Sequence, residues 1–260
     1  MSTFKGQTAL ITGASAGMGV DYARELAAQG ANLILVARRA DRLEQVKADL
    51  AEQFSVDIRI LPCDLGDATA RDAMYQQLKR EAVVVDMLIN NAGLGLNGPF
   101  LDSDWASVQN MINVDISALT HLTQLFGQDM KARGAGNILL VASVVGHLSV
   151  PNYAVYSASK NYVRALGTAL RHEFKPYGVN VTIVSPGATA TEFFDVAGDT
   201  PSFMVRMVTG SSIGVVRAAL RAMRRRRREV VPGVLNWMTT VQARLLPAGL
   251  MTSFVNRIFN

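Results

Sequence analysis

Short apolar runs alternate with longer amphipathic segments along most of the chain. The apolar runs predict buried strands at 7–12, 32–37, 56–61, 84–90, 136–142, 179–185 and, in a last short piece, near 229–232. The segments between them carry apolar residues at helical spacing and predict helices at about 19–29, 41–53, 67–81, 104–132, 153–175 and 211–228. Strands separated by helices pair in parallel through right-handed crossovers. The pattern therefore predicts an α/β fold with a doubly wound parallel sheet and helices on both faces.

A glycine-rich turn joins the first predicted strand to the first predicted helix. The strand Gln7–Thr12 leads into the turn Gly13–Gly19, and the helical pattern follows from Val20. This arrangement presents backbone N–H groups and the positive end of a helix dipole to a pyrophosphate. The spacing is GxxxGxG, which allows the same close backbone approach as the commoner GxGxxG. The turn predicts a dinucleotide site; the alternative is a tight strand-to-helix connection without a ligand.

Tyr156 and Lys160 lie four residues apart on a predicted helix, so both side chains share one face. A lysine cation beside a phenol favours the phenolate, so the pair can exchange a proton with an alcohol or a carbonyl. Ser143 follows the predicted strand 136–142, at the sheet edge where such folds bind ligands. Taken singly, each of these residues also fits a solvated helix face or a turn.

Further motifs occur in a characteristic order: TGASAGMG at 12–19, NNAG at 90–93, Asn113, Ser143, YSASK at 156–160, and Pro186-Gly187 with Thr191. In these motifs and their order the chain resembles the short-chain dehydrogenase/reductase family over roughly residues 5–192. The resemblance implies a Rossmann-type fold of about seven strands, with a single catalytic domain at 1–232. It also implies an oxidoreductase that interconverts a carbonyl and a secondary alcohol with a nicotinamide cofactor.

The resemblance assigns catalytic roles to four residues. Tyr156 is expected to be the general acid/base, and Lys160 to lower the pKa of that tyrosine and to bind the nicotinamide ribose. Ser143 is expected to donate a hydrogen bond to the substrate oxygen. Asn113 is expected to hold a water that connects Lys160 to solvent.

The resemblance also assigns residues to the cofactor. Asp64 is expected at the adenine amine, Asn90 at the adenosine ribose, Ser15 at the phosphates and Thr191 at the nicotinamide end or its phosphate. The complete set expected to bind the cofactor is Gly13, Ser15, Gly17, Met18, Gly19, Arg38, Arg39, Asp64, Leu65, Asn90, Ala92, Gly93, Tyr156, Lys160, Pro186, Gly187, Thr189 and Thr191.

The end of the second predicted strand bears on the choice of cofactor. An NAD site usually has Asp or Glu there for the ribose 2′-hydroxyl, whereas this strand ends in Ala37 followed by Arg38 and Arg39. A guanidinium can bind a 2′-phosphate through charge-assisted hydrogen bonds. The nearby acid Asp41 lies where the next helix starts and fits a capping role. The sequence therefore predicts NADP(H); if the arginines only face solvent, an NAD-dependent alcohol dehydrogenase is the alternative.

The substrate is predicted to be a small lipophilic ketone, aldehyde or secondary alcohol. A lid is expected at about 192–212, where glycine and proline punctuate a segment rich in aromatic residues and methionine. Further apolar residues expected beside it are Leu94, Leu96, Leu148, Val150 and Tyr153. The same residues would also serve simply to bury the lid against the core. A non-catalytic module that binds a dinucleotide or a membrane surface is the remaining alternative class, since fold alone does not fix function.

Composition limits the classes of partner and compartment. One cysteine, Cys63, excludes an intramolecular disulfide, and no apolar signal core or membrane-spanning run is present in the 260 residues. We therefore predict a cytoplasmic protein, with peripheral contact at a membrane surface as an open option. Three isolated histidines argue against a metal site. The net charge is +5, and a run of cations, Arg224–Arg228, lies at the end of a predicted helix, where cations complement the helix dipole. No nucleic-acid-binding motif accompanies them, so no nucleic acid is expected as a partner.

The last residues, 233–260, form an amphipathic extension that Pro247 divides in two. One apolar stripe contains Val234, Leu235, Met238, Val241, Leu245 and Leu246, and the other Leu250, Met251, Phe254, Val255, Ile258 and Phe259. The favoured interpretation is docking on the domain or on a partner subunit; the alternative is a helix lying in a bilayer interface. The family resemblance implies a homodimer or homotetramer that forms through the predicted helices 104–132 and 153–175.

Overall fold

The computed structural model describes residues 4–188 and 210–259. A seven-stranded, wholly parallel sheet in the order β3-β2-β1-β4-β5-β6-β7 runs through its centre. The strands are β1 Thr8–Thr12, β2 Asn32–Ala37, β3 Ile58–Pro62, β4 Met87–Asn90, β5 Gly136–Val141, β6 Val179–Val184 and β7 Glu229–Val230. The prediction of a doubly wound α/β fold is confirmed.

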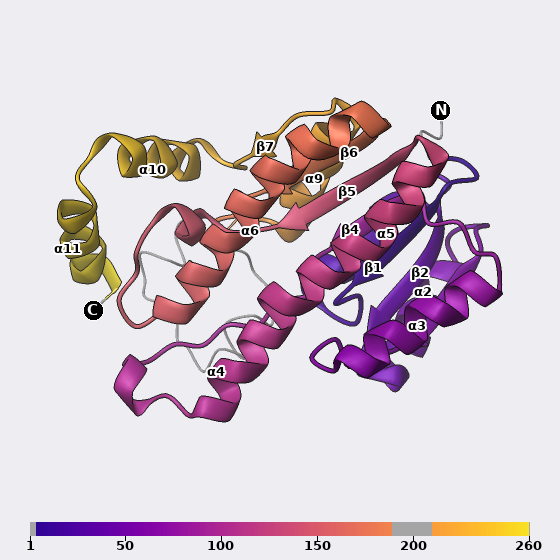
Figure 1. The fold of residues 1–260 in the computed structure, drawn as a ribbon, viewed down its shortest axis with the longest axis horizontal. Helices are drawn as coiled ribbons and strands as arrows, with labels where there is room; N and C mark the ends of the chain where they lie inside the picture. Colours follow the sequence, from indigo (N-terminus) through magenta and orange to yellow (C-terminus); the bar gives the residue numbers. More distant parts are fainter. Residues whose placement is uncertain (1–3, 189–209, 260) are drawn as a thin grey trace.

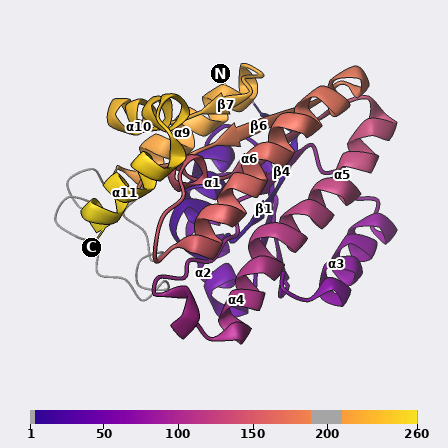
Figure 2. The ribbon, with the colours of Figure 1, turned by 60° about the vertical axis from the view of Figure 1, so that its left-hand side comes forward.

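Helices cover both faces of the sheet (Figures 1 and 2). One layer contains α1 (Gly17–Ala27), α2 (Ala40–Ala51) and α9 (Ser212–Arg224). The other contains α3 (Ala68–Arg80), α5 (Leu119–Arg133) and α6 (Ala154–Phe174). The short helix α4 (Trp105–Ile112) precedes α5, and α10 (Val234–Leu245) and α11 (Ala248–Phe259) lie beyond β7 at the edge of the domain (Figure 1).

Strand β1 shows how the sequence pattern builds these two layers. Leu10 packs with the α3, α5 and α6 side, and its neighbour Ile11 packs with the α1, α2 and α9 side, both without solvent exposure. Successive side chains of a strand point to opposite faces, so a strand covered on both faces is largely apolar. Burying one such side chain contributes about 1.5–3 kcal/mol.

The segment predicted as one helix over 104–132 is not uniform. A π-helical stretch, η2 (Asn113–Ala118), separates α4 from α5. π-Turns inside helices often occur at functional sites, because the extra residue turns side chains toward a new direction. The predicted strand 84–90 is also shorter than expected: it begins at Met87, and Val84 is 48% exposed. An exposed valine at the strand entrance cannot be distinguished from a buried one by sequence pattern.

The two C-terminal stripes behave differently. Most of the first stripe, on α10, is exposed, and Thr240 is the residue of that helix that is buried. In the second stripe, Met251 and Val255 of α11 are buried in a cluster with Tyr156 of α6 and Tyr153, the N-cap of that helix. Docking on the domain therefore holds for α11 and not for the apolar face of α10. Within the described ranges no helix combines the length and apolar character needed to cross a bilayer.

Candidate active site

A cavity of about 330 Å³ opens at the carboxyl ends of strands β1 to β4. Parallel α/β sheets bind ligands at this edge, because the loops there converge around the point where the strand order reverses. The strand order places β1 between β2 and β4, so the reversal lies beside the glycine-rich turn. The lining residues are Gly13, Ser15, Ala16, Gly17, Met18, Ala37, Arg38, Arg39, Cys63, Asp64, Leu65, Asn91, Ala92, Gly93, Leu94 and Val114.

The glycines of the turn are required by close packing. Gly13 has φ +67°, and a Cβ there would lie 2.9 Å from Cα of Ala92. A Cβ at Gly19 would lie 2.0 Å from the carbonyl oxygen of Gly13, closer than any real contact. The turn is therefore folded tightly onto the start of α1, which brings the helix N-terminus to the cavity wall.

The N-terminus of α1 is left free for a ligand. Its N-cap residue Ala16 makes no side-chain capping bond, and its first turn carries no acidic residue. By contrast, Asp67 caps α3 and Asp104 caps α4 through their carboxylates. An uncapped helix start with glycine at its first position offers backbone N–H groups and positive potential to an anion. The residues present thus fit the pyrophosphate of a dinucleotide.

Cations line the same cavity at the end of β2. Arg38 and Arg39 both border it, and Nη2 of Arg39 donates a hydrogen bond to Oγ of Ser15 at 3.4 Å. Asp41 lies in the first turn of α2 and does not appear among the lining residues. The charged side chains that line the cavity at the end of β2 are therefore basic. The N-cap of α2 is Arg39, and the capping role expected of Asp41 is not seen.

The NNAG motif contributes differently from what the sequence suggests. Asn90 is buried, and its Nδ2 donates to Oγ1 of Thr123 at 2.9 Å, away from the cavity lining. The next residue, Asn91, lines the cavity, and its Nδ2 donates to the carbonyl of Thr12 at 3.0 Å. Oγ1 of Thr12 in turn accepts from the backbone N–H groups of Asn91 and Ala92, each at 3.0 Å. These bonds join the ends of β1 and β4 into one wall.

Ser143, Tyr156 and Lys160 come together beside this wall. Ser143 is the N-cap of the 3-10 helix η3 (Val144–His147), and its side chain forms a hydrogen bond with Tyr156. Nζ of Lys160 lies 5.5 Å from the centre of the Tyr156 ring, as expected for residues one helical turn apart. A Cβ on Gly93 would approach Nζ of Lys160 to 2.9 Å, so the ammonium group lies directly behind a residue of the cavity lining.

Asp115 is a member of the site that the sequence did not identify. Its Oδ2 lies 3.0 Å from Nζ of Lys160, and the carboxylate is fully buried. Its Oδ1 accepts a 2.7 Å hydrogen bond from the backbone N–H of Leu94. The predicted residue Asn113 lies at the start of the same π-helical stretch, where its Oδ1 accepts from Nε2 of Gln109 at 3.1 Å. The group that contacts Lys160 is therefore the carboxylate two residues further along.

Burial and neighbouring charges shift the pKa values of Tyr156 and Lys160. Burial raises the pKa of Tyr156; Lys160 and the Ser143 hydrogen bond lower it, Asp115 raises it further, and the net direction is upward. Burial lowers the pKa of Lys160, but the charges of Asp115 and Tyr156 outweigh burial and raise it. The phenol thus holds its proton more tightly than a lysine neighbour alone would predict.

The remaining predicted residues lie at the end of β6 or beyond the described ranges. The carbonyl of Pro186 accepts from the backbone N–H of Val144 at 2.8 Å and from Oγ of Ser143 at 3.4 Å. Gly187 packs against Asn236 of α10, where a Cβ would come within 2.4 Å of the amide. Thr189, Thr191 and most of the predicted lid at 192–212 lie outside the described residues.

Comparison with known proteins identifies relatives that are similar to this chain in sequence. The family model for short chain dehydrogenases matches residues 7–201. Ketoacyl reductase HetN of Nostoc sp. is 37% identical over 191 residues, covering 72% of this chain and 65% of that protein. A very-long-chain 3-oxoacyl-CoA reductase of Pyrenophora tritici-repentis is 36% identical over 197 residues, covering 74% of this chain and 58% of that protein. The chain therefore matches less than two thirds of the length of these two relatives.

A solved structure is similar along nearly the full chain. A short-chain dehydrogenase from Sphingobium yanoikuyae in complex with NADPH superimposes with a TM-score of 0.83 at 32% identity, covering 94% of this chain and 95% of that chain. Fold, motifs and sequence similarity agree. The chain belongs to the short-chain dehydrogenase family of oxidoreductases.

Proposed function

We propose that this protein is an NADP(H)-dependent oxidoreductase that reduces the carbonyl group of a lipophilic substrate to a secondary alcohol. The observation that carries the proposal is the hydrogen-bonded pair Ser143 and Tyr156, with Lys160 behind it at the cavity wall. Bound NADPH would supply the hydride, and the reaction would consume one proton for each carbonyl reduced.

The chain's own residues supply that proton and hold the substrate oxygen. The Tyr156 hydroxyl donates a proton to the oxygen as negative charge develops there, and the Ser143 hydroxyl donates a second hydrogen bond to the same atom. Lys160 stabilises the phenolate that remains after the transfer. Because the pKa of Tyr156 is raised, the phenol is protonated at neutral pH and suited to act as an acid. This state favours carbonyl reduction over alcohol oxidation.

The basic end of β2 supports a preference for NADPH. A 2′-phosphate in the cavity would meet Arg38, Arg39 and the Ser15 hydroxyl that Arg39 already contacts. A hydrogen bond to a charged group contributes about 1.5–3 kcal/mol, which corresponds to at least a tenfold preference for the phosphorylated cofactor.

The apolar wall around Tyr156 supports a lipophilic substrate. Tyr156 shares a buried cluster with Met111 of α4, Val150 and Tyr153 next to α6, and Met251 of α11. Such a wall accommodates hydrocarbon better than a charged or phosphorylated group, because unpaired charges lose hydration there. Two relatives are named for reductions of ketoacyl substrates. We propose long-chain 3-oxoacyl thioesters as the substrate class.

Two measurements test the proposal. Fluorescence titration of the protein with NADPH and NADH should give much tighter binding of NADPH. Loss of NADPH absorbance with 3-oxododecanoyl-CoA as the probe should show turnover, and the shorter acetoacetyl-CoA should react more slowly. Tyr156→Phe should lose roughly 100-fold or more in kcat and still bind NADPH. Near-normal turnover by Tyr156→Phe would contradict the assigned mechanism. Binding of NADH more tightly than NADPH would contradict the proposed preference for NADP(H).

A further inference from the structure

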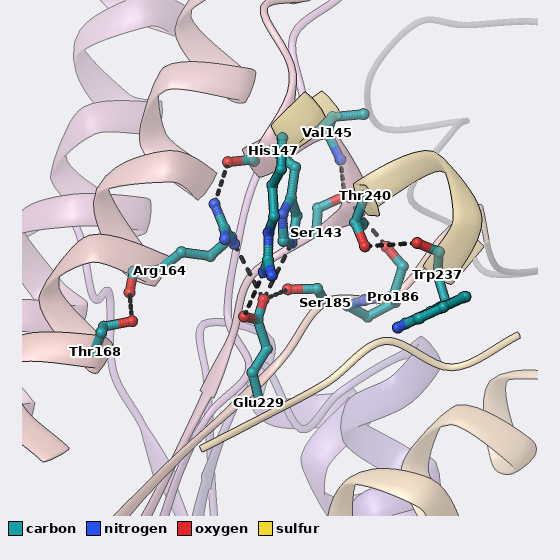
Figure 3. Close-up of polar contacts among 12 residues, drawn as sticks. Ser143, Val145, His147, Arg164, Thr168, Ser185, Pro186, Glu229, Trp237 and Thr240 are labelled. Carbon is teal, nitrogen blue, oxygen red and sulfur yellow. Dashed lines mark hydrogen bonds and ion pairs between the residues drawn. The ribbon is translucent and has the colours of Figure 1, made fainter. Parts of the chain in front are cut away.

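A second polar centre lies behind the candidate active site, around the carboxylate of Glu229 in β7 (Figure 3). One oxygen, Oε1, accepts three hydrogen bonds: from Nε2 of His147 at 3.1 Å, Nε of Arg164 at 3.1 Å and Oγ of Ser185 at 2.8 Å. Nη2 of Arg244 in α10 lies 3.8 Å from the other oxygen, Oε2. Four elements, β7, η3, α6 and α10, and the residue that follows β6 thus meet at one carboxylate.

This carboxylate is buried and ionised. The Glu229 side chain is 8% exposed, and that of His147 is 1% exposed. Burial alone would raise the pKa of Glu229, but the hydrogen bonds from His147 and Ser185 and the charge of Arg164 lower it to about 2. A carboxylate only accepts hydrogen bonds, so Nε2 of His147 is the donor in this contact. A buried carboxylate that accepts several hydrogen bonds holds its donors in fixed positions. Moving any one donor away is costly, because the buried charge is then less well compensated.

Two of the donors lie on the segments that carry the catalytic residues. His147 ends η3, the 3-10 helix that Ser143 caps. Arg164 lies on α6 one turn beyond Lys160, and its Nη1 also donates to the carbonyl of Gly146 at 2.9 Å. A Cβ on Gly146 would lie 2.7 Å from the backbone of Lys160, so η3 rests directly on α6. Glu229 and Arg164 therefore tie the Ser143 segment to the Tyr156 helix.

The third donor ties in the end of β6. The backbone N–H of Ser185 donates to the carbonyl of Val230 at 2.9 Å, and its hydroxyl donates to Glu229. The following residue, Pro186, accepts from the backbone of Val144 and from Oγ of Ser143. The Ser143 hydroxyl is therefore held from two directions, through η3 and through β6, and both paths lead to Glu229.

We infer that Glu229 is a positioning residue that fixes the Ser143 hydroxyl relative to Tyr156 through His147, Arg164 and Ser185. This inference rests on the proposed function of Ser143 and Tyr156 in proton transfer. A donor that stabilises developing charge must sit within a few tenths of an ångström of its place. The buried Glu229 carboxylate and its donors supply that rigidity from behind the site, away from substrate and solvent.

Glu229→Gln in the full chain tests the inference, since it keeps the shape and removes the charge. We expect kcat with NADPH and 3-oxododecanoyl-CoA to fall roughly tenfold to 100-fold, with the Kd for NADPH changed less than about twofold. The matched control is Glu25→Gln, which breaks the carboxylate pair with Arg217 (2.9 Å) on the α1 and α9 side and should leave kcat unchanged. Ser185→Ala removes a single neutral donor and should lower kcat in the same direction by a smaller factor.

A double mutant separates positioning from general loss of stability. In the Ser143→Ala background, Glu229→Gln should lower kcat by less than about threefold further, because its effect acts through the missing hydroxyl. The inference is overturned if the decreases in kcat of Ser143→Ala and Glu229→Gln multiply in the double mutant. It is also overturned if kcat is unchanged in both Glu229→Gln and Ser185→Ala.

Hydrogen exchange tests the same geometry without turnover. The backbone N–H groups of Val144, Gly146 and Leu148 are hydrogen-bonded within this region. Their exchange should speed up about tenfold or more in Glu229→Gln, while α1 stays as in the wild type. Unchanged exchange overturns the positioning role. A wild-type protein that binds NADPH and does not reduce the probe would contradict the proposed function alone, and the exchange result would still decide the role of Glu229.

Discussion

Nζ of Lys160 and Oδ2 of Asp115 form a buried ion pair at 3.0 Å, directly behind the residues that line the cofactor cavity. The lysine beside Tyr156 is thus not an isolated cation. Its positive charge is largely balanced before it acts on Tyr156. The centre therefore holds its protons to higher pH than an unpaired lysine would allow.

Asp115→Asn should shift the pH profile of the reaction. Asp115 raises the pKa of both Tyr156 and Lys160, so removing its charge lets the Tyr156–Lys160 pair lose its first proton at lower pH. Carbonyl reduction, which needs the protonated phenol, should then decline at lower pH than in the wild type. Alcohol oxidation should begin at lower pH. Profiles of kcat in both directions check this, and unshifted profiles would show that the ion pair has no part in proton transfer.

Arg38→Ala and Arg39→Ala should each weaken NADPH binding far more than NADH binding. Loss of one charge-assisted contact to the 2′-phosphate corresponds to a roughly 10- to 100-fold rise in Kd for NADPH. Arg42, an exposed residue of α2 outside the cavity lining, provides the matched control as Arg42→Ala. Fluorescence titration with both cofactors measures the effect. An equal loss of affinity for NADH and NADPH would remove the phosphate role.

Gly19→Ala should disrupt the cofactor site and destabilise the fold. The new Cβ would lie 2.0 Å from the carbonyl oxygen of Gly13, a backbone atom that can move only if the turn opens. Overpacking of this kind costs about 1–3 kcal/mol. Gly249→Ala in α11 places its Cβ in open space, so it should not lower stability and should leave binding unchanged. Thermal unfolding and NADPH titration compare the two; equal behaviour would contradict the packing argument.

Glu229→Gln should reduce the sensitivity of the fold to acid. The pKa of Glu229 is about 2 in the folded protein and near its ordinary value of 4.5 in the unfolded chain, so the unfolded chain takes up the proton first as pH falls. The stability from this group is present above about pH 4.5 and is lost as pH falls toward 2. It amounts to at most about 3 kcal/mol. Urea unfolding between pH 6 and pH 3 should show a shallower decline in the variant than in the wild type.

The fold and the outline of the site followed from sequence pattern. Strands β2 and β5 contain continuous apolar runs, at 33–37 and 138–141, and the glycine-rich turn and the Tyr156–Lys160 spacing are local signals. Local signals survive folding because they depend on neighbours in the chain. The two-residue strand β7 was located near its true position for the same reason: the short segment Glu229–Pro232 directly follows the run of cations Arg224–Arg228.

The residues that were missed depend on distant partners. Asp115 is an acid in a predicted helix, which usually faces solvent, and only the π-helical turn and the approach of α6 bury it against Lys160. The shift from Asn90 to Asn91 is a displacement of one position at a strand end, which exchanges a buried direction for the cavity. The partners of Glu229 are between 44 and 82 residues away in the chain for its three hydrogen bonds. Hydrophobic periodicity along the sequence does not predict contacts between residues so far apart in the chain.

The bonds between Thr12 and Asn91 also have a consequence for how the protein folds. They join positions 79 residues apart, and they complete the cavity wall only after β1 has paired with β4. That pairing encloses the whole β2 and β3 region, and long-range parallel pairing is intrinsically slow. The ability to bind a dinucleotide should therefore appear late in refolding, after most helical structure has formed. The cofactor would then bind only chains that have completed this last step, and would stabilise them.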